Sequence, residues 1–412
     1  MKGRDRIHRP ISGDRRRFLA MAGRALLGGL LTRAALAMAA AESTKDVTLF
    51  LCGDVMTGRG VDQILPHPGN PRLHEFYMHS ALGYLELAEE ATGPIKHPVD
   101  FAYIWGDALA ELERRQPAVR IINLETAVTT SDSAWRGKGI HYRMHPANVP
   151  CLSAARIDCC GLANNHVMDW GIEGLEETLT VLHAAGIKTP GAGRNWTEAS
   201  APAVFELPSG SRVLVFAFGS GTAGVFPAWL ATENRPGVNV LDDFSSRSLQ
   251  DVRRRIASVK RSSDVVVVSL HWGDNWGYDV PRDQMEFAHG LIDVAGADIV
   301  HGHSSHHPKA IEVYRDKLIL YGCGDFINDY EGIGGYESYR SDLTLMYFPT
   351  FDPGTGRLRQ LSLTPMQIRH FRVNRTGGED MHWLEAMLNR EGRRFGTRFR
   401  LASDGSLAAE WR

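Results

Sequence analysis

The chain has 412 residues, of which 43% are apolar and 23% are charged, and these are the values of an ordinary globular protein with a sizeable core. Its 46 basic and 48 acidic residues give a formal net charge of −2, which excludes a bulk electrostatic attraction to nucleic acid. This length accommodates one large domain or two ordinary ones.

The first forty or so residues differ in composition from the rest of the chain. A basic, polar stretch ends at Arg15 to Arg17, and an apolar, alanine-rich stretch follows from Phe18 to Ala41. Arginines directly ahead of an apolar run are typical of a twin-arginine export signal. An uncleaved membrane anchor is the alternative, but Arg24 and Arg33 interrupt the apolar run, and a central Arg is costly in a spanning helix. We therefore expect residues 1–41 to direct the protein to the periplasm or cell envelope.

Beyond this segment, strand-like and helical stretches alternate. Apolar, β-branched runs at 47–51, 119–122 and 265–270 indicate buried strands, and the amphipathic pattern over 171–185 indicates a helix. Further strands are expected at 156–162, 212–218, 298–300, 317–321, 343–348 and 361–371, and further helices at 73–91, 103–115, 244–260, 282–295 and 379–390. Such alternation is typical of a layered α/β fold. We expect one domain over 46–340, with a C-terminal extension at 341–412 that completes or flanks its core.

Five of the expected strands are followed by a residue that can bind a metal. These residues are Asp54, Glu125, Asn165 with His166, His271, and His303 with His306. Each alone is a weak indication, because an Asp after a strand usually serves a turn or a helix cap. Ligands in α/β sheets bind at the carboxyl ends of the strands, so we expect these side chains to converge at one edge. Carboxylate and amide oxygens mixed with imidazoles suit Mn²⁺, Zn²⁺ or Fe.

The segments around these residues occur in the order seen in one known family. They are Gly53–Arg59, Asn123–Glu125, Leu162–Gly171, His271–Gly273, Gly302–His306, Ile311–Tyr314 and Tyr321–Phe326. On these segments, which span residues 47–329, the chain resembles the CapA family of bacterial capsule proteins, within the calcineurin-like metallophosphoesterase superfamily. The resemblance implies a four-layer α/β/β/α sandwich. It also implies a role in synthesis, anchoring or processing of poly-γ-glutamate or a related envelope polymer, with that anionic polymer as substrate and a membrane capsule-synthesis complex as candidate partner.

The resemblance implies a role for each matching position. Asp54, Glu125, Asn165, His271, His303 and His306 would bind divalent metal, with His307 as a competitor for the place of His306. His166, held by Asp169, would donate a proton to the leaving group. For Asp169 the alternative is a helix cap at the start of the helix that follows.

Two departures from the phosphoesterase pattern weaken one of the two metal sites. Met56 stands where those enzymes have a histidine, and a thioether is a poor ligand for a hard metal. Glu125 replaces a bridging aspartate. We therefore expect one tightly bound metal rather than two. The tight site would use Asn165, His271, His303 and Glu125, and the weak or empty one Asp54 and His306.

Arg59 and Arg143 are the candidates for substrate binding. Arg59 closely follows Asp54, and Arg143 lies in the long polar loop 126–145, whose length indicates a functional or mobile segment. A guanidinium pairs with a carboxylate through two hydrogen bonds, and poly-γ-glutamate carries one carboxylate per residue. A surface salt bridge is the alternative for each arginine. The glycine- and acid-rich segment 325–336 is either a rim loop or a lid whose Glu331 reaches the metal pocket.

Three functions are compatible with these observations. The first is a capsule-polymer protein with a metal-dependent hydrolase-type site, the second is a metal-dependent phosphoesterase with an unrelated substrate, and the third is a non-catalytic assembly subunit. Met56 favours the first and third over the second. The pair Asn165 and His166, together with His271 and His303, favours an enzyme over a binding module.

Overall fold

The computed structural model describes residues 46–412, so the expected export signal at 1–41 lies outside the described residues. Within residues 46–412, no helix is long and apolar enough to cross a membrane.

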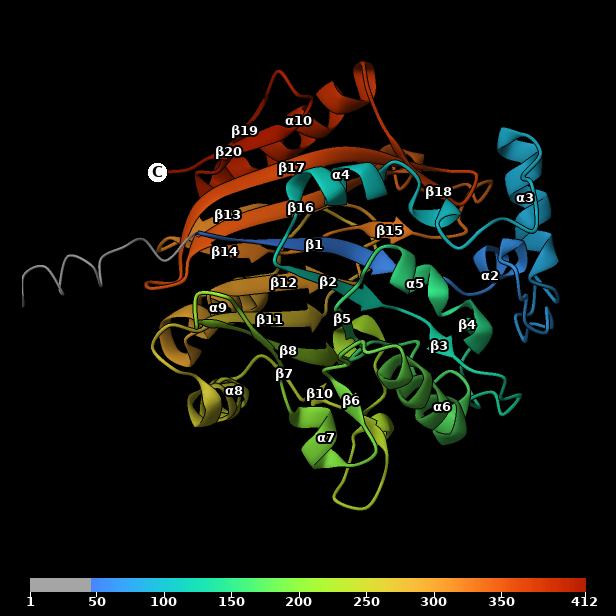
Figure 1. Ribbon diagram of the computed structural model, residues 1–412, viewed down its shortest axis with the longest axis horizontal. Coiled ribbons are helices and arrows are strands. Elements are labelled where there is room, and N and C mark those ends of the chain that lie inside the picture. Colours follow the sequence, from blue (N-terminus) through green and yellow to red (C-terminus); the bar gives the residue numbers. More distant parts are fainter. Residues whose placement is uncertain (1–45) are drawn as a thin grey trace, which may run out of the picture. The chain divides into compact units, whose positions relative to one another are not determined.

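Two β-sheets form the centre of the described chain (Figure 1). The first contains β1 (Val47–Val55), β2 (Val119–Leu124), β5 (Cys159–Gly161), β15 (Asp325–Ile327), β16 (Leu343–Asp352), β17 (Arg357–Arg369), β18 (Arg372–Arg375), β19 (Arg398–Leu401) and β20 (Leu407–Glu410). Its order is β19-β20-β17-β16-β1-β2-β5, with β15 also beside β1 and β18 also beside β17.

The second sheet contains β7 (Ala203–Glu206), β8 (Arg212–Ser220), β10 (Val240–Leu241), β11 (Val265–His271), β12 (Ile299–His303), β13 (Ile311–Tyr314) and β14 (Lys317–Leu320). Its order is β10-β8-β11-β12-β14-β13, with β7 also beside β8. Two short pairs lie outside these sheets, β3 (Ala127–Val128) with β4 (Arg143–Met144) and β6 (Ala192–Gly193) with β9 (Gly237–Val238).

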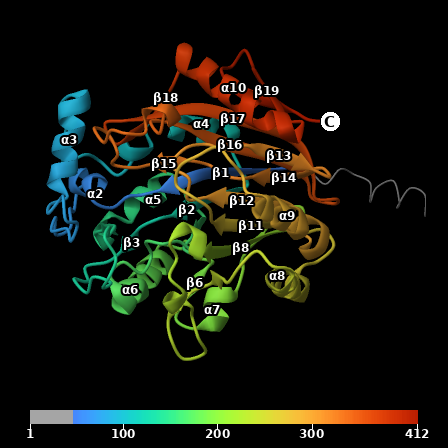
Figure 2. The same cartoon turned by 180° about the vertical axis from the view of Figure 1, so that it is seen from behind.

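Helices surround the two sheets. They are α2 (Gly60–Ile64), α3 (Leu82–Thr92), α4 (Ala108–Arg115), α5 (Pro150–Ala154), α6 (Gly171–Ala184), α7 (Trp196–Ser200), α8 (Ser246–Val259), α9 (Arg282–Gly290) and α10 (Glu379–Gly392). Residues of α4, α5 and α6 share a hydrophobic core with the first sheet, and residues of α8 and α9 share one with the second. Figure 1 shows α4 and α5 in front of the first sheet, and the reverse view in Figure 2 shows α9 in front of the second.

Strand β1 shows how alternating side chains build two layers of core. Leu49 and Leu51 are buried against the second sheet, together with residues such as Val267 of β11. Phe50 and Cys52, which point to the opposite side of the strand, are buried beneath the helices. Because both faces of the strand are covered, the sequence reads as a continuous apolar run. The predicted four-layer α/β/β/α sandwich is confirmed.

The residues after 341 belong to the first sheet. Strand β16 pairs antiparallel with β1, with Val47 opposite Phe351, and β17 pairs with β16 along most of its length. Helix α10 closes one end of the space between the sheets, because its Leu384 and Met387 are buried in the core that the two sheets share.

Two predicted helices differ from the observed ones. The stretch predicted at 73–91 becomes helical only at Leu82, after an irregular segment closed by a bridge between Arg72 and Ser80. The stretch predicted at 103–115 is interrupted at Gly106, whose φ is 46°. A Cβ at this position would lie 2.2 Å from the carbonyl oxygen of Val373, so the chain needs glycine where it turns against β18.

Candidate functional site

Three of the predicted metal ligands come together from the carboxyl ends of three strands. Asp54 comes from β1, His271 from β11 and His303 from β12, and all three are buried. One ligand atom of each lies within 4.8 Å of the other two. His271 and His303 are in register across β11 and β12, and their Nδ1 atoms lie 2.9 Å apart. One carboxylate and two imidazoles in this arrangement form a typical ligand set for a divalent transition metal.

Asn165 and Glu125 complete the cluster from the first sheet's side. The Oδ1 atom of Asn165 lies 2.9 Å from Nε2 of His271, and Oε1 of Glu125 lies 3.7 Å from the same nitrogen. The other oxygen of Glu125, Oε2, is buried and has no hydrogen-bond partner within the described chain. Burial, followed by the nearby Asp54 and Asp325, raises the pKa of Glu125 well above its usual range. Because an unpaired buried carboxylate oxygen is costly, this donor set fits a divalent cation.

The carboxylate of Asp54 is held from both sides. Asn123 Nδ2 donates to its Oδ1 at 2.7 Å, and the backbone N–H of Ser304 donates to its Oδ2 at 2.9 Å. The preceding residue, Gly53, brings β1 against the segment before β15, since a Cβ there would lie 1.7 Å from the carbonyl oxygen of Gly324. The glycine before Asp54 is therefore required by close approach of two backbones.

His306 is paired with Asp325, a residue to which the sequence analysis gave no role. Nδ1 of His306 lies 2.9 Å from Oδ1 of Asp325, whose Oδ2 accepts a hydrogen bond from Asn328 Nδ2 at 2.8 Å. Burial alone would lower the pKa of His306, but the charge and the hydrogen bond of Asp325 raise it. The structure thus groups Asp54 with His271 and His303, whereas the expected weak second site grouped it with His306. The strand-end rule that selected Asp54 could also have selected Asp325, because Gly324-Asp325 repeats the pattern of Gly53-Asp54.

His166 and Asp169 form a hydrogen-bonded pair beside the cluster. Nδ1 of His166 lies 2.6 Å from Oδ2 of Asp169, which also accepts a hydrogen bond from the backbone N–H of Tyr142 at 2.6 Å. Helix α6 begins at Gly171 with no side-chain cap, so the alternative of Asp169 as a helix cap is wrong. Burial raises the pKa of Asp169 to about 6, against the opposing effect of the neighbouring Lys138.

Lys138 is the second residue that the sequence analysis missed. It lies in the long loop between β3 and β4, and its Nζ contacts Oδ1 of Asp169 and lies 2.9 Å from Nδ1 of His166. Burial, then the positive charges of Lys138 and Arg59, hold the pKa of His166 well below its usual value. His166 is therefore a neutral imidazole whose Nε2 faces Oε1 of Glu125 at 3.7 Å. Only the length of the loop pointed to function, because a lone lysine in a polar loop carries no pattern of its own.

Comparison with known proteins identifies the family of this chain. Residues 48–330 match the family model described as bacterial capsule synthesis protein PGA_cap. The chain belongs to this family. The predicted resemblance to CapA proteins is thereby confirmed.

Individual relatives extend the comparison. The chain is 47% identical to a probable polyglutamine synthesis accessory protein of Mycobacterium tuberculosis over 362 residues, which are 88% of this chain and 95% of that protein. It is 26% identical to the capsule biosynthesis protein CapA of Bacillus anthracis, over 80% of this chain and 69% of that one. It is 30% identical to the PGA biosynthesis protein CapA of Bacillus subtilis, over 60% of each. Among solved structures, a phosphatase from Mycoplasma pneumoniae is similar with a TM-score of 0.42 and 9% identity, over 78% of this chain and 94% of that one.

In this PGA_cap protein, Met56 is buried next to the cluster but contacts aromatic residues. Its Sδ lies 3.9 Å from the hydroxyl of Tyr330, which lies 3.1 Å from the hydroxyl of Tyr142. His307, the alternative to His306 as a ligand, instead packs against an aromatic ring, with 4.7 Å between its ring centroid and that of Tyr339.

The two predicted substrate-binding arginines both have protein partners. Arg59 is buried and donates to both carboxylate oxygens of Asp329, at 3.1 and 2.5 Å, and to Glu75 at 3.1 Å. Arg143 donates to Asp132 at 2.8 Å, and its guanidinium lies 3.9 Å from the ring centroid of Trp170. Carboxylates of the protein itself therefore compensate both guanidinium charges. Binding of substrate by either arginine stays a prediction.

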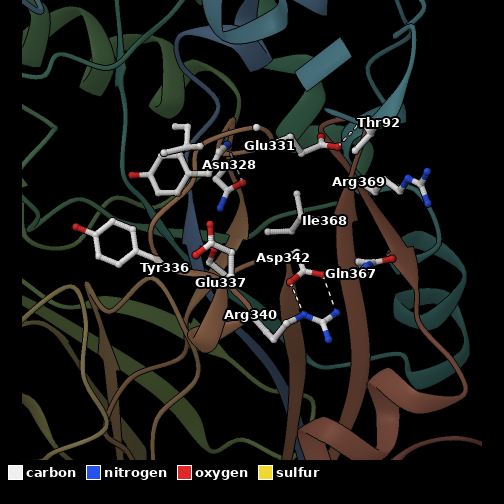
Figure 3. A pocket seen from close by; sticks show the side chains of 14 residues that line it. Thr92, Asn328, Glu331, Tyr336, Glu337, Arg340, Asp342, Gln367, Ile368 and Arg369 are labelled. Atoms are coloured by element: carbon white, nitrogen blue, oxygen red, sulfur yellow. Dashed lines mark hydrogen bonds and ion pairs between the residues drawn. The ribbon is translucent and has the colours of Figure 1, made fainter. Parts of the chain in front are cut away.

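A hollow of about 400 Å³ is lined by residues of the segment after β15 and of strand β17 (Figure 3). Asn328 lines it and also donates to Asp325, so one residue separates the hollow from the partner of His306. Figure 3 shows Glu337 and the ion pair of Arg340 with Asp342 along this hollow. The interpretation of Glu331 as a group that reaches the metal pocket is wrong, because its carboxylate accepts hydrogen bonds from the backbone of His370 and Phe371 at 2.8 and 2.7 Å.

Proposed function

We propose that this PGA_cap protein is an exported accessory protein of glutamate-polymer synthesis that cuts or transfers its polymer at a metal-dependent hydrolase-type site. The observation that carries the proposal is the convergence of Asp54, His271 and His303 around a common point, next to the unpaired Oε2 of Glu125. The names of the relatives, which refer to polyglutamine, PGA and capsule synthesis, support the polymer class.

Asp54, His271, His303, Asn165 and Glu125 would hold one divalent metal of the Mn, Zn or Fe kind, as the mixed oxygen and nitrogen donors suggest. A metal in this position supplies a Lewis acid that polarises a carbonyl oxygen and makes water easier to deprotonate. His306 is paired with Asp325, and Met56 is a poor ligand for a hard metal, which are the reasons to propose one tight site rather than two.

The proton chemistry belongs to His166. Amide hydrolysis adds the hydroxyl of water to the carbonyl carbon, breaks the C–N bond and places the proton of water on the leaving nitrogen. Neutral His166 takes that proton on Nε2 and then delivers it to the nitrogen, acting first as base and then as acid. Asp169 orients the ring through Nδ1, and Lys138 keeps the ring uncharged before the reaction.

The test measures the metal bound to the purified protein. It also measures shortening of poly-γ-glutamate and polyglutamine, and hydrolysis of a generic phosphodiester. We expect one equivalent of metal, and loss of both metal and polymer cleavage in His303→Ala. His289→Ala is the matched control, because this histidine of α9 pairs with Glu312 of β13 and lies outside the cluster. Metal binding without any cleavage would identify a non-catalytic assembly subunit, and cleavage of the phosphodiester alone would identify a phosphoesterase. Absence of bound metal would contradict the proposed site.

Export by the twin-arginine route is part of the same proposal, and the arginines ahead of the apolar stretch support it. Replacing Arg15 and Arg16 with Lys should leave the protein inside the cell. The matched control is Arg4→Lys together with Arg6→Lys, which changes the same number of arginines in the basic stretch but leaves Arg15 to Arg17 intact. Export of both variants at the same level would contradict this route.

A further inference from the structure

A second feature of the molecule lies far from the metal cluster, at the edge of the first sheet. Strand β19 is the outermost strand, four places from β1 in the sheet, which corresponds to about 19 Å at the usual spacing between strands. Figure 1 shows β19 and β20 near the C-terminal end of the chain, whereas the arrowhead of β1, where Asp54 lies, points away from that end. A hollow of about 620 Å³ lies beside β19, and four arginines line it, namely Arg393, Arg398, Arg400 and Arg412.

These arginines are exposed and poorly compensated by acidic groups. Arg400 pairs with Glu410 at 3.0 Å, whereas Arg393 and Arg398 form no ion pair with any residue between 46 and 412. By contrast, Arg372 of β18 in the same sheet is paired with Asp107 at 2.9 Å. Like charges around one hollow repel each other, and a bound anion would relieve that repulsion.

The backbone beneath the arginines is firmly held. Arg398 and Arg400 alternate with the buried Phe399, so both project from the same face of β19, roughly 7 Å apart along the strand. The side-chain amide of Asn389 on α10 bonds to both backbone groups of Phe399, at 2.9 and 2.8 Å. The backbone of β19 is therefore fixed by α10, so Arg398 and Arg400 extend from a rigid strand.

A structural role explains only one of these four arginines, Arg393. Arg393 follows the last residue of α10, where a positive charge stabilises the carboxyl end of a helix. That argument does not apply to Arg398 and Arg400, which lie on a strand. Their regular spacing instead fits a linear chain with repeated anionic groups.

We propose that this arginine groove, formed by Arg393, Arg398, Arg400 and Arg412, binds a polycarboxylate chain at a place distinct from the metal cluster. The proposal rests on the proposed function for the choice of a glutamate-derived polymer. Guanidinium groups pair with carboxylates through two parallel hydrogen bonds. Polyglutamate offers one carboxylate per residue, whereas the side-chain amides of polyglutamine are neutral and leave the arginines uncompensated. A groove remote from the cluster would retain a long chain while another part of it lies at the metal site.

The test measures binding of fluorescently labelled poly-γ-glutamate to the purified protein by anisotropy, with polyglutamine of equal length as second ligand. The groove variant replaces Arg393, Arg398 and Arg400 with Gln. The control variant replaces Arg247, Arg253 and Arg254 of α8 with Gln, which removes the same charge from exposed positions on the other sheet's outer face. We expect the groove variant to bind polyglutamate at least about tenfold more weakly, from the loss of three exposed ion pairs, and the control to change less than about twofold.

The other outcomes either contradict polymer binding in the groove or separate it from the proposed hydrolase activity. Equal losses of affinity for polyglutamate in the groove and control variants would show that only the net charge of the protein matters. Equal affinity for polyglutamine and polyglutamate would exclude a preference for carboxylates. Loss of binding in His303→Ala, with normal binding in the groove variant, would place the polymer at the metal cluster alone. Binding to phosphatidylglycerol vesicles but not to polyglutamate would show a lipid surface instead. Polymer binding through the groove without any cleavage would uphold this inference while contradicting the proposed hydrolase activity.

Discussion

Asp54 and Asp325 lie opposite each other on the neighbouring parallel strands β1 and β15, at the edge where the metal-binding side chains meet. Burial, followed by the charge of Asp325, raises the pKa of Asp54 to about 7. With Glu125 also buried nearby, three acidic groups lie close together in the interior. Such an arrangement is costly unless a cation or protons compensate it.

The first prediction concerns stabilisation by metal. Added Mn²⁺ or Zn²⁺ should raise the melting temperature by several degrees, because a ligand that binds only the folded state at 100 times its Kd contributes about 2.7 kcal/mol. Chelation should reverse the rise, and Asp54→Asn should abolish it. Differential scanning fluorimetry measures the effect, with Asp46→Asn, at the exposed start of the domain, as control. An equal metal response in Asp54→Asn and wild type would remove Asp54 from the ligand set.

The second prediction concerns Lys138 as the counter-charge of Asp169. Lys138→Met leaves a buried carboxylate without its cation, so we expect the free energy of unfolding to fall by about 3 to 5 kcal/mol. The double variant Lys138→Met with Asp169→Asn should recover part of that loss, because it removes both charges. Urea unfolding of the two single variants and the double variant completes the cycle. Strictly additive losses would show that the two side chains do not interact.

Most of the fold and the main ligands were predictable because they depend on local patterns. Apolar runs predicted the central strands, and the residue after each strand end predicted Asp54, His271 and His303 as neighbours. Parallel sheets place such ends at one edge whatever the loops do, so no knowledge of loop conformation was needed.

The parts that could not be predicted depend on how loops fold back over the site. Lys138 reaches Asp169 only because the loop from β3 to β4 crosses the edge of the sheet. Arg59 meets Glu75 because the segment before α3 is irregular, whereas its sequence reads as a helix. Amphipathic spacing could not reveal that tertiary contact would override helix formation there.

The third prediction separates a structural from a substrate-binding role of Arg59. Its guanidinium is buried between Asp329 and Glu75 and lies 3.8 Å from the ring centroid of Tyr84. We expect Arg59→Met to lose about 3 to 5 kcal/mol of stability, because two buried carboxylates lose their partner. Thermal unfolding measures this loss. A variant as stable as wild type that binds polymer more weakly would instead support substrate binding.

The fourth prediction is a pH dependence outside the site. Burial alone would raise the pKa of Glu111 in α4, but hydrogen bonds from Arg114, Arg115 and Thr364 outweigh burial and lower it to about 2. Because the pKa in the folded state is lower than in the unfolded state, ionised Glu111 stabilises the protein above about pH 4.5, and that contribution fades as pH falls toward 2.

Glu111→Gln should therefore be less stable than wild type at pH 7, and the difference should shrink as the pH falls below about 4.5. Urea unfolding at several pH values measures both proteins. Glu113→Gln is the control, since this neighbouring side chain is exposed and pairs with Arg156 at 3.6 Å on the surface. A stability difference that grew on acidification would contradict the assignment to Glu111.

The last prediction concerns Met56, which stands where dinuclear phosphoesterases have a histidine. Its side chain is buried next to Tyr330, whose ring centroid lies 5.1 Å from that of His306, so the position lies on the His306 side of the cluster. A thioether binds hard metals poorly, whereas an imidazole would join His306 and Asp325 as a ligand. We expect metal content to rise from about one equivalent toward two in Met56→His, and to stay at one in Met56→Leu, which keeps the volume without adding a ligand. Elemental analysis of the three purified proteins measures the change, together with hydrolysis of a generic phosphodiester. Two tightly bound equivalents in wild type would refute the single-metal argument and would favour an ordinary phosphoesterase.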